Sequence, residues 1–415
     1  MSYPVCQINS ICSLVTSGGT PLTKNLSYYN PPEIPWLKTA EVNYCRIYDT
    51  EKYISKEGLN NSSAKLIPEN SVIVAMYGQG DTAGRVAINK IPLATNQACC
   101  NLVIDEEKAD YQFVYYALST LYDKLVSLKN GGAQPNLNAG IIKALEIPCP
   151  PLETQRRIAS IISAYDDLIE NNQKQIKLLE EAAQRLYKEW FVDLRFSNYE
   201  NTPVVDGVPE GWKKKTVLEC LELHIGGGWG KETETGKNVI PGRVIRGTDI
   251  NDIKSGNFKE VPIRFHTEND IKKRSLKEND IVFELSNGNI NNIGRSLFID
   301  NLILKNCGEN TICASFCKLF RPLDRTHALT LYFEIQDMQL SGRMLPYKKQ
   351  GSNGINNFAF EDFLKHELLV PQNLKMLLPF ENIMKKICNI QSQFALLTEV
   401  RDRLLPKLMS GELEV

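Results

Sequence analysis

The chain has 415 residues, 42% of them hydrophobic, and a formal net charge of −1. This length predicts two or three domains with sizeable cores. The near-neutral charge argues against a stand-alone basic DNA clamp, so any contact with nucleic acid must come from local clusters or be shared with a partner. No apolar run approaches the roughly 20 residues of a membrane span, and no signal peptide opens the chain. We therefore expect a cytoplasmic protein.

Eleven cysteines and four histidines are scattered through the sequence. No Cys-x-x-Cys occurs, and Cys313 and Cys317 have no matching second pair. Zinc sites usually combine two such pairs, or one pair with two histidines. We therefore predict no metal site and interpret the cysteines as reduced core residues.

Residues 1–150 are predicted to form a mixed α/β domain with many short strands. A glycine loop, GGTP (18–21), precedes the strand of IPWLKTAEV (34–42), and alternating apolar residues in SVIVAMY (71–77) indicate another strand. A helix is predicted over residues 112–128. A polar loop then leads into a short apolar strand that ends at Pro150-Pro151.

A long helix is predicted over residues 152–192, within a spacer segment that covers residues 151–195. It contains no internal Pro or Gly, and its apolar residues repeat on a heptad. One seam position holds Ile162, Ile169, Ile176, Ala183 and Trp190, and the other holds Ile158, Tyr165, Asn172, Leu179 and Leu186.

Residues 196–371 repeat the plan of the first domain. IPGRVIRGTDI (240–250) matches the segment ending in KTAEV at an offset of 208, and Val72 aligns with Val282 at an offset of 210. A helix over residues 327–344 is predicted to match the one at 112–128. The drift in offset indicates loop insertions in one of two copies.

A second spacer helix, in residues 372–415, keeps the heptad phase of the first at an offset of 218. Its two seam positions hold Phe380, Ile387, Phe394, Arg401 and Leu408, and Ile383, Ile390, Leu397 and Leu404. The shared phase predicts an intramolecular antiparallel coiled coil. The expected fold class is therefore mixed α/β, with two repeated domains joined by two long helices in a pseudo-two-fold arrangement.

The sequence assembles no catalytic constellation. GGGWGKE (226–232) lacks the first glycine and the Ser/Thr of a phosphate-binding loop. NPPE (30–33) has Glu33 where amino-methyltransferases have an aromatic residue, and Asp280 and Glu284 lack the lysine of a metal-dependent nuclease core. We therefore expect no catalytic residue and no cofactor in this chain.

The helical block LNAGIIKALEIPCPPLETQRRIASIISAYDDLIE (137–170) and the ending VRDRLLPKLMSGEL (400–413) resemble the specificity (S) subunits of type I restriction–modification enzymes. The resemblance covers nearly the whole chain. In the second domain, GGGWGKE and VIRGTDI replace the GGTP and WLKTAEV of the first, which leaves the target of that half open.

The resemblance implies a non-catalytic DNA-recognition subunit. Each target recognition domain would read one half of a bipartite site in double-stranded DNA, and the coiled coil would set the half-site spacing. Two methylation (M) subunits, which bind S-adenosylmethionine, would dock on the helices and methylate adenine. Restriction (R) subunits, which use ATP and Mg, would join that core.

Base reading requires paired donors and acceptors, supplied by Asn and Gln for adenine and by Arg and Lys for guanine. In the first domain we expect these to be Lys38, Tyr77, Gln79, Arg85, Gln134 and Asn136, and in the second Arg246, Asn287, Asn289, Arg295, Gln350 and Asn353. Phosphate contacts are expected from Lys348 and Lys349 and from Lys272, Lys273 and Arg274. The surface facing the methylation subunits is expected to include Arg156, Arg157, Tyr187, Trp190 and Phe191, although Trp190 also fits the seam.

Three alternatives stay open at this point. A single-chain methyltransferase or nuclease would need a complete cofactor loop, and binding of S-adenosylmethionine by the purified chain would favour it. A structural scaffold of duplicated domains predicts no sequence-specific DNA retention in the assembled complex. An isolated specificity-type protein would lack partner genes in its neighbourhood.

Overall fold

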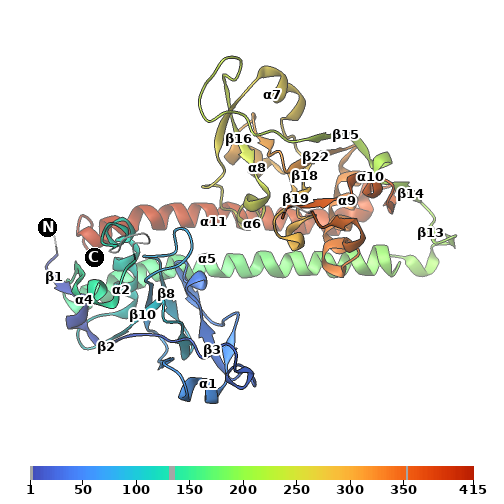
Figure 1. Ribbon diagram of the computed structural model, residues 1–415. Coiled ribbons are helices and arrows are strands. Elements are labelled where there is room, and N and C mark those ends of the chain that lie inside the picture. The colour runs from blue at the N-terminus through green and yellow to red at the C-terminus, as the bar shows by residue number, and fades with distance from the viewer. Residues whose placement is uncertain (1–2, 130–135, 352–353) are drawn as a thin grey trace. The chain divides into compact units, whose positions relative to one another are not determined.

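The computed structural model describes residues 3–129, 136–351 and 354–415 (Figure 1). It divides into two units: the first contains residues 1–167 and 398–415, and the second contains residues 168–397. Both long helices cross the division, so each unit combines one α/β domain with a piece of each helix. Within the described ranges, no helix is long and apolar enough to cross a membrane.

Most strands of the first unit belong to two sheets, and the strands of these sheets alternate along the chain. Its elements are β1 (Val5–Gln7), β2 (Cys12–Ser17), β3 (Ile34–Leu37), β4 (Cys45–Ile47), β5 (Tyr53–Ile54), α1 (Lys56–Asn60), β6 (Leu66–Ile67), β7 (Val72–Ala75), β8 (Val86–Asn89), β9 (Leu93–Thr95), β10 (Cys99–Ile104), α2 (Tyr111–Ser119), α3 (Tyr122–Ser127), α4 (Ala139–Ala144) and β11 (Glu146–Pro148). The larger sheet has the order β2-β10-β7-β8-β4, and the smaller has the order β5-β3-β9-β6.

The second unit repeats this topology. Its elements are β12 (Val204–Val205), β13 (Val208–Pro209), β14 (Trp212–Thr216), β15 (Leu221–Gly226), β16 (Ile240–Ile245), α6 (Ile250–Ser255), β17 (Ile263–His266), α7 (Glu268–Arg274), β18 (Ile281–Glu284), β19 (Ser286–Asn287), β20 (Ser296–Phe298), α8 (Asn301–Cys307), β21 (Ile312–Cys313), β22 (Cys317–Pro322), α9 (Arg325–Ser341), β23 (Lys348–Lys349), β24 (Asn356–Phe358), α10 (Phe360–Phe363) and β25 (Glu367–Pro371). The order β15-β22-β18-β20 corresponds to β2-β10-β7-β8, and the order β17-β16-β21 corresponds to β5-β3-β9.

The register of the strands corrects one part of the sequence alignment. Cys99 pairs with Ala75 in the first unit and Cys317 pairs with Glu284 in the second, so β7 and β18 align at an offset of 209 rather than 210. The turns before these strands agree, because Asn70 and Asn279 both have positive φ, at 63° and 74°. The prediction that Val72 matches Val282 is therefore wrong by one residue, and such a slip moves a side chain to the opposite face of the sheet.

The predicted helix at 112–128 is also corrected. It is divided into α2 and α3, which are separated by Thr120 and Leu121. Its counterpart α9 is continuous and ends at Gly342, which has a φ of +80°. Glycine adopts this left-handed conformation without steric cost and commonly ends helices.

The spacer helices form as predicted: α5 covers Leu152–Tyr187, continues in a π-helical turn over Lys188–Val192, and is matched by α11 (Leu378–Ser410). Ile158, Ile162 and Leu408 share one hydrophobic cluster in the first unit. In the second unit, Trp190 packs its ring against Phe380 at 5.8 Å. Residues near the start of α5 contact residues near the end of α11, and residues near the end of α5 contact residues near the start of α11. The two helices are therefore antiparallel. The predicted mixed α/β fold with an antiparallel coiled coil is confirmed.

Candidate nucleic-acid interface

In each unit, several strands end at one edge of the domain, which we call the loop edge. In the first unit, Asn96 N–H donates to the carbonyl of Leu37 at 2.9 Å, and Leu137 N–H donates to the carbonyl of Met76 at 3.0 Å. Met76 N–H also donates to the carbonyl of Ala98 at 2.8 Å, so these bonds bring the residues after β3, β7 and β9 together. The parallel pairing of β3 with β9 places their carboxyl ends at the same edge.

Five of the six residues predicted to read bases in the first domain lie at this loop edge, and Gln134 lies outside the described residues. Lys38 follows β3, and its backbone N–H donates to the Glu41 carboxylate at 2.9 Å, which holds the turn. Arg85 donates to Asn43 Oδ1 at 3.0 Å. Tyr77 is half-buried against the core, whereas Gln79 and Asn136 are exposed. The geometry is compatible with a shared polar surface.

The corresponding residues in the second unit hold one another in place. Arg295 Nε donates to Glu284 Oε2 at 2.8 Å, and Asn287 Nδ2 donates to Glu284 Oε1 at 2.7 Å. Arg246 forms an ion pair with Asp249 at 2.6 Å, which fixes the turn equivalent to that of Lys38. The polar groups of these residues are therefore partly engaged within the protein. Glu284, considered above as a nuclease carboxylate, is the acceptor at their centre.

Other predicted contacts in the second unit are more exposed. Asn289 caps a short turn by accepting from Asn291 N–H at 3.0 Å, and Gln350 is exposed. Lys348 is half-buried, and this burial lowers the pKa of its ammonium group. Lys349 lies 3.8 Å from Asp362 in an exposed pair. The predicted residue Asn353 lies outside the described residues.

The lysines of α7 suit contact with a polyanion. Lys272 and Lys273 are exposed, while Arg274 is held by Asp270 and donates from Nε to the carbonyl of Gly226 at 3.1 Å. Gly226 ends β15 at the loop edge, so the last turn of α7 lies beside that edge.

A pocket of about 530 Å³ opens at the loop edge of the second unit. Trp229 and Phe316 contribute to its wall, and their side chains remain 38% and 59% exposed. Large exposed aromatic residues at a polar edge are informative because most such rings are buried. The sequence analysis missed both, although their positions in the glycine loop and just before Cys317 mark them as departures from the first copy.

Two predicted partner-facing residues are core residues instead. Tyr187 is 2% exposed and donates from its hydroxyl to Glu334 Oε2 at 2.7 Å. Phe191 is buried and stacks on Tyr187 with a centroid distance of 4.5 Å. Because their heptad positions turn these rings toward the domain, neither offers a surface for a partner. Arg156 and Arg157 are exposed, and Trp190 is half-buried.

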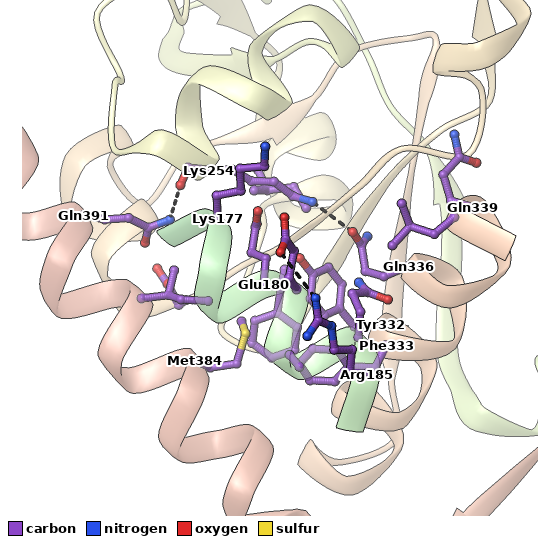
Figure 2. Close-up of a pocket in the computed structure, with 18 of the residues that line it drawn as sticks. Lys177, Glu180, Arg185, Lys254, Tyr332, Phe333, Gln336, Gln339, Met384 and Gln391 are labelled. Atoms are coloured by element: carbon purple, nitrogen blue, oxygen red, sulfur yellow. Dashed lines mark hydrogen bonds and ion pairs between the residues drawn. The ribbon is translucent and has the colours of Figure 1, made fainter. Parts of the chain in front are cut away.

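A second pocket, of about 460 Å³, lies between the helices and α9 within the second unit (Figure 2). Lys254 lies between two glutamines: its ammonium donates to Gln336 Oε1 at 3.1 Å, and its carbonyl accepts from Gln391 Nε2 at 2.7 Å. These bonds make the pocket a joint between domain and helix rather than a reaction site. Across the part of the chain that the structure describes, no group of His, Cys, Asp or Glu could hold a metal ion.

Comparison with known proteins identifies the class. Residues 3–181 match the family described as Type I restriction modification DNA specificity domain. The MjaIX specificity subunit of Methanocaldococcus jannaschii is 28% identical over 97% of this chain and 91% of its own length. The EcoR124I/EcoR124II specificity subunit of Escherichia coli is 28% identical over 43% of this chain and 45% of its own length.

A solved structure shares the fold. The crystal structure of a type I restriction-modification S subunit from M. genitalium gives a TM-score of 0.56 at 15% identity, covering 98% of this chain and 96% of that one. Over nearly its whole length the chain is similar to specificity subunits of type I restriction–modification systems, and residues 3–181 match the specificity domain of that family. These relatives are specificity subunits, which are non-catalytic, and the enzymatic activities of type I systems lie in partner subunits.

Proposed function

We propose that residues 1–150 and 196–371 are two target recognition domains, each reading one half of a bipartite DNA site through its loop edge. The repeated edge is the observation that carries this proposal. Lys38 and Arg246 follow equivalent strands, because Leu37 pairs with Thr95 as Ile245 pairs with Cys313. Two equivalent surfaces with different side chains are what two different half-sites require.

The proposed contacts divide by chemistry. Side chains at the two loop edges would read bases, namely Lys38, Tyr77, Gln79, Arg85 and Asn136 in the first domain and Arg246, Asn287, Asn289, Arg295 and Gln350 in the second. Lys348, Lys349, Lys272 and Lys273 would contact phosphates, which position the duplex without specifying its sequence. Because Arg295 and Asn287 already bind Glu284, their contribution includes holding the edge in shape.

The helix pair would act as the spacer of the complex. With 36 residues at about 1.5 Å each, α5 is about 54 Å long. We propose that two M subunits dock on the helices, with Arg156 and Arg157 among the contacts, and that R subunits join them. S-adenosylmethionine, ATP and Mg would be bound by those partners, in the cytoplasm where the DNA lies.

The experiment is methylome sequencing of host DNA with and without this gene, with the M subunit present in both strains. Loss of N6-methyladenine at one split motif, two specific parts around a fixed gap, is the expected result. Loss of a continuous motif would contradict the two-domain reading, and an unchanged methylome would contradict a working specificity subunit. Co-purification of M with the R156A/R157A variant tests docking, and we expect less M to be retained.

A further inference from the structure

The pocket at the loop edge of the second unit, which we call the Phe316 pocket, has the features of a built binding site. Its volume of about 530 Å³ lies among Trp229, Phe316, Arg246, Glu284, Asn287 and Ile355. Trp229 and Phe316, which keep a large exposed fraction, line the pocket together with the carboxylate of Glu284, which is only 2% exposed. This combination of flat apolar walls and one charged acceptor is suited to a planar ligand with hydrogen-bond donors on its edge.

The walls of the pocket are held in position. The Arg264 guanidinium lies over the Trp229 ring at 4.7 Å, and Arg264 also pairs with Glu232 at 3.2 Å. The carbonyl of Phe316 accepts from Leu285 N–H at 2.8 Å, which anchors the loop that carries the ring. Anchored aromatic residues bind a ligand with a smaller loss of conformational entropy than mobile ones do.

The carboxylate of Glu284 keeps acceptor capacity. Oε2 accepts from Arg295 at 2.8 Å and Oε1 accepts from Asn287 at 2.7 Å. A carboxylate has about four lone-pair sites, so each oxygen can accept one further hydrogen bond. The flanking donors fix the orientation of the two oxygens, and the group therefore presents two adjacent acceptors and no donor to the pocket.

We propose that the Phe316 pocket receives one guanine of the second half-site, turned out of the base stack when the complex binds DNA. Guanine is the base whose pairing edge presents two adjacent donors, the N1–H and the N2 amino group, and these match two carboxylate oxygens. Adenine and cytosine place an acceptor nitrogen beside their amino group, and thymine presents one donor between two acceptors. Turned-out bases are held in this manner, by stacking and by bonds to the pairing edge.

The inference rests on the proposed function, since it requires the loop edge to face DNA, but it treats the two half-sites differently. In the first unit, the register places Ala98 where Phe316 stands and Ala75 where Glu284 stands. Neither alanine can stack on a base or accept from its edge. The turned-out base therefore belongs to the second half-site alone.

The test uses the assembled complex and duplexes that carry the motif found by methylome sequencing. The cytosine opposite each second-half guanine is removed in turn, which lowers the cost of unpairing that guanine. At one position we expect at least tenfold tighter binding, and replacing that guanine by inosine, which lacks the 2-amino group, is expected to weaken binding about tenfold. The same removals in the first half-site are expected to bring no gain.

The variant F316A is expected to abolish the gain while the complex still binds the motif. L323A is the matched control, because Leu323 is an exposed residue beyond the opposite end of β22. No gain at any second-half guanine with the wild-type complex, an equal gain in the first half-site, or a gain that survives F316A would each overturn the inference. Failure of the proposed function is distinct, because the wild-type complex would then show no preference for a split motif.

Discussion

The two units join their domains to the helix pair through the same two chemical groups, with the roles exchanged. In the first unit, Tyr116 of α2 donates to Asp166 of α5 at 2.6 Å, and Arg401 of α11 donates to the same carboxylate at 2.8 Å. In the second unit, Tyr187 of α5 donates to Glu334 of α9 at 2.7 Å. The helix supplies the carboxylate in one unit and the tyrosine in the other.

This difference shows which properties of the repeat are retained. The strands that the two units share keep the same order and register, whereas the side chains that join domain to helix differ. Many sequences can form the same backbone pairing. A buried polar contact requires one donor and one acceptor, but either the helix or the domain can supply the donor. We call these two sets of contacts the domain–helix junctions. Each junction can therefore be altered by mutation without changing the other.

The largest effect is expected from E334Q. Glu334 is buried and also accepts from Arg343 at 2.9 Å and contacts His366 at 2.8 Å. Removing its charge takes one of two carboxylate partners from Arg343, which keeps Asp337 at 2.6 Å, and weakens the charge-assisted hydrogen bonds to Glu334, so we expect a loss of about 3 kcal/mol in the free energy of unfolding. Urea denaturation with peptide-resolved hydrogen exchange would locate the loss in the second unit. The control E367Q, in an exposed pair with Lys214, is expected to cost less than about 1 kcal/mol.

Low pH should weaken the domain–helix junction of the second unit, because Glu334 is protonated there. Burial alone would raise the pKa of Glu334, but hydrogen bonds from His366 and Arg343 outweigh it and lower the pKa from 4.5 to about 2. A carboxylate with a depressed folded-state pKa stabilises the fold above pH 4.5 and loses that contribution as the pH falls toward 2. The shift corresponds to about 3 kcal/mol. Stability measured across this window should fall less in E334Q than in wild type, and equal slopes would contradict the assignment.

The next effect concerns a backbone contact that both units share. Gly18 N–H donates to the carbonyl of Cys99 and Gly227 N–H donates to that of Cys317. A Cβ at Gly18 would overlap the carbonyl oxygen of Thr95, and one at Gly227 would overlap that of Ala314. We expect G18A and G227A each to cost about 2–3 kcal/mol in their own unit. The neighbouring G226A is the control, since a Cβ there meets nothing within 4 Å, and unequal losses would show that the two loops are not equivalent.

A smaller effect should separate the two half-sites. K38A is expected to weaken binding of the M-containing complex about tenfold and to relax specificity in the first half-site alone, because one good base contact contributes about 1–3 kcal/mol. Competition binding with duplexes altered in either half measures this. K108A is the control, since Lys108 follows the opposite end of β10 and pairs with Asp105 at 2.9 Å. Equal relaxation in both halves would contradict the separation.

The smallest effects are expected when the tyrosine hydroxyls of the two domain–helix junctions are removed. Y116F and Y187F each remove a hydroxyl but retain the ring, and the carboxylate partners keep an arginine donor. We expect losses of about 1 kcal/mol in each unit. Thermal unfolding of both variants would check this. A loss confined to one variant would mean that the exchanged junctions contribute unequally.

Much of the fold follows from periodicity. The seam residues Ile162, Ile169 and Ile176 are buried as the heptad predicts, and so are Phe380 and Phe394. The strands were identified from alternation, but their register was not. The apolar residues of the two copies align almost equally well at two offsets that differ by one residue. The asparagines with positive φ that identify the correct offset are evident only in the folded backbone.

The candidate site was less accessible to sequence reasoning. The loop positions of Lys38 and Arg246 were predicted from matched strand ends, and the structure places both as expected. The burial of Tyr187 and Phe191 was not predicted. An amphipathic helix that packs on both a second helix and a domain has a wider apolar face than the heptad pattern indicates. The Phe316 pocket depends on five separate segments meeting, which no local pattern records.

The division of the chain has a consequence for synthesis on the ribosome. The second unit is one continuous segment, whereas the first needs residues 398–415, of which Leu408 and Met409 are buried in its core. Domains generally fold as they emerge, the N-terminal one first. Here the order should reverse, because residues 1–167 can complete their unit only after residues 398–415 have been synthesised. Protease digestion of ribosome-arrested chains should find residues 168–397 protected before the first unit, and protection of the first unit in chains that stop at residue 397 would contradict this.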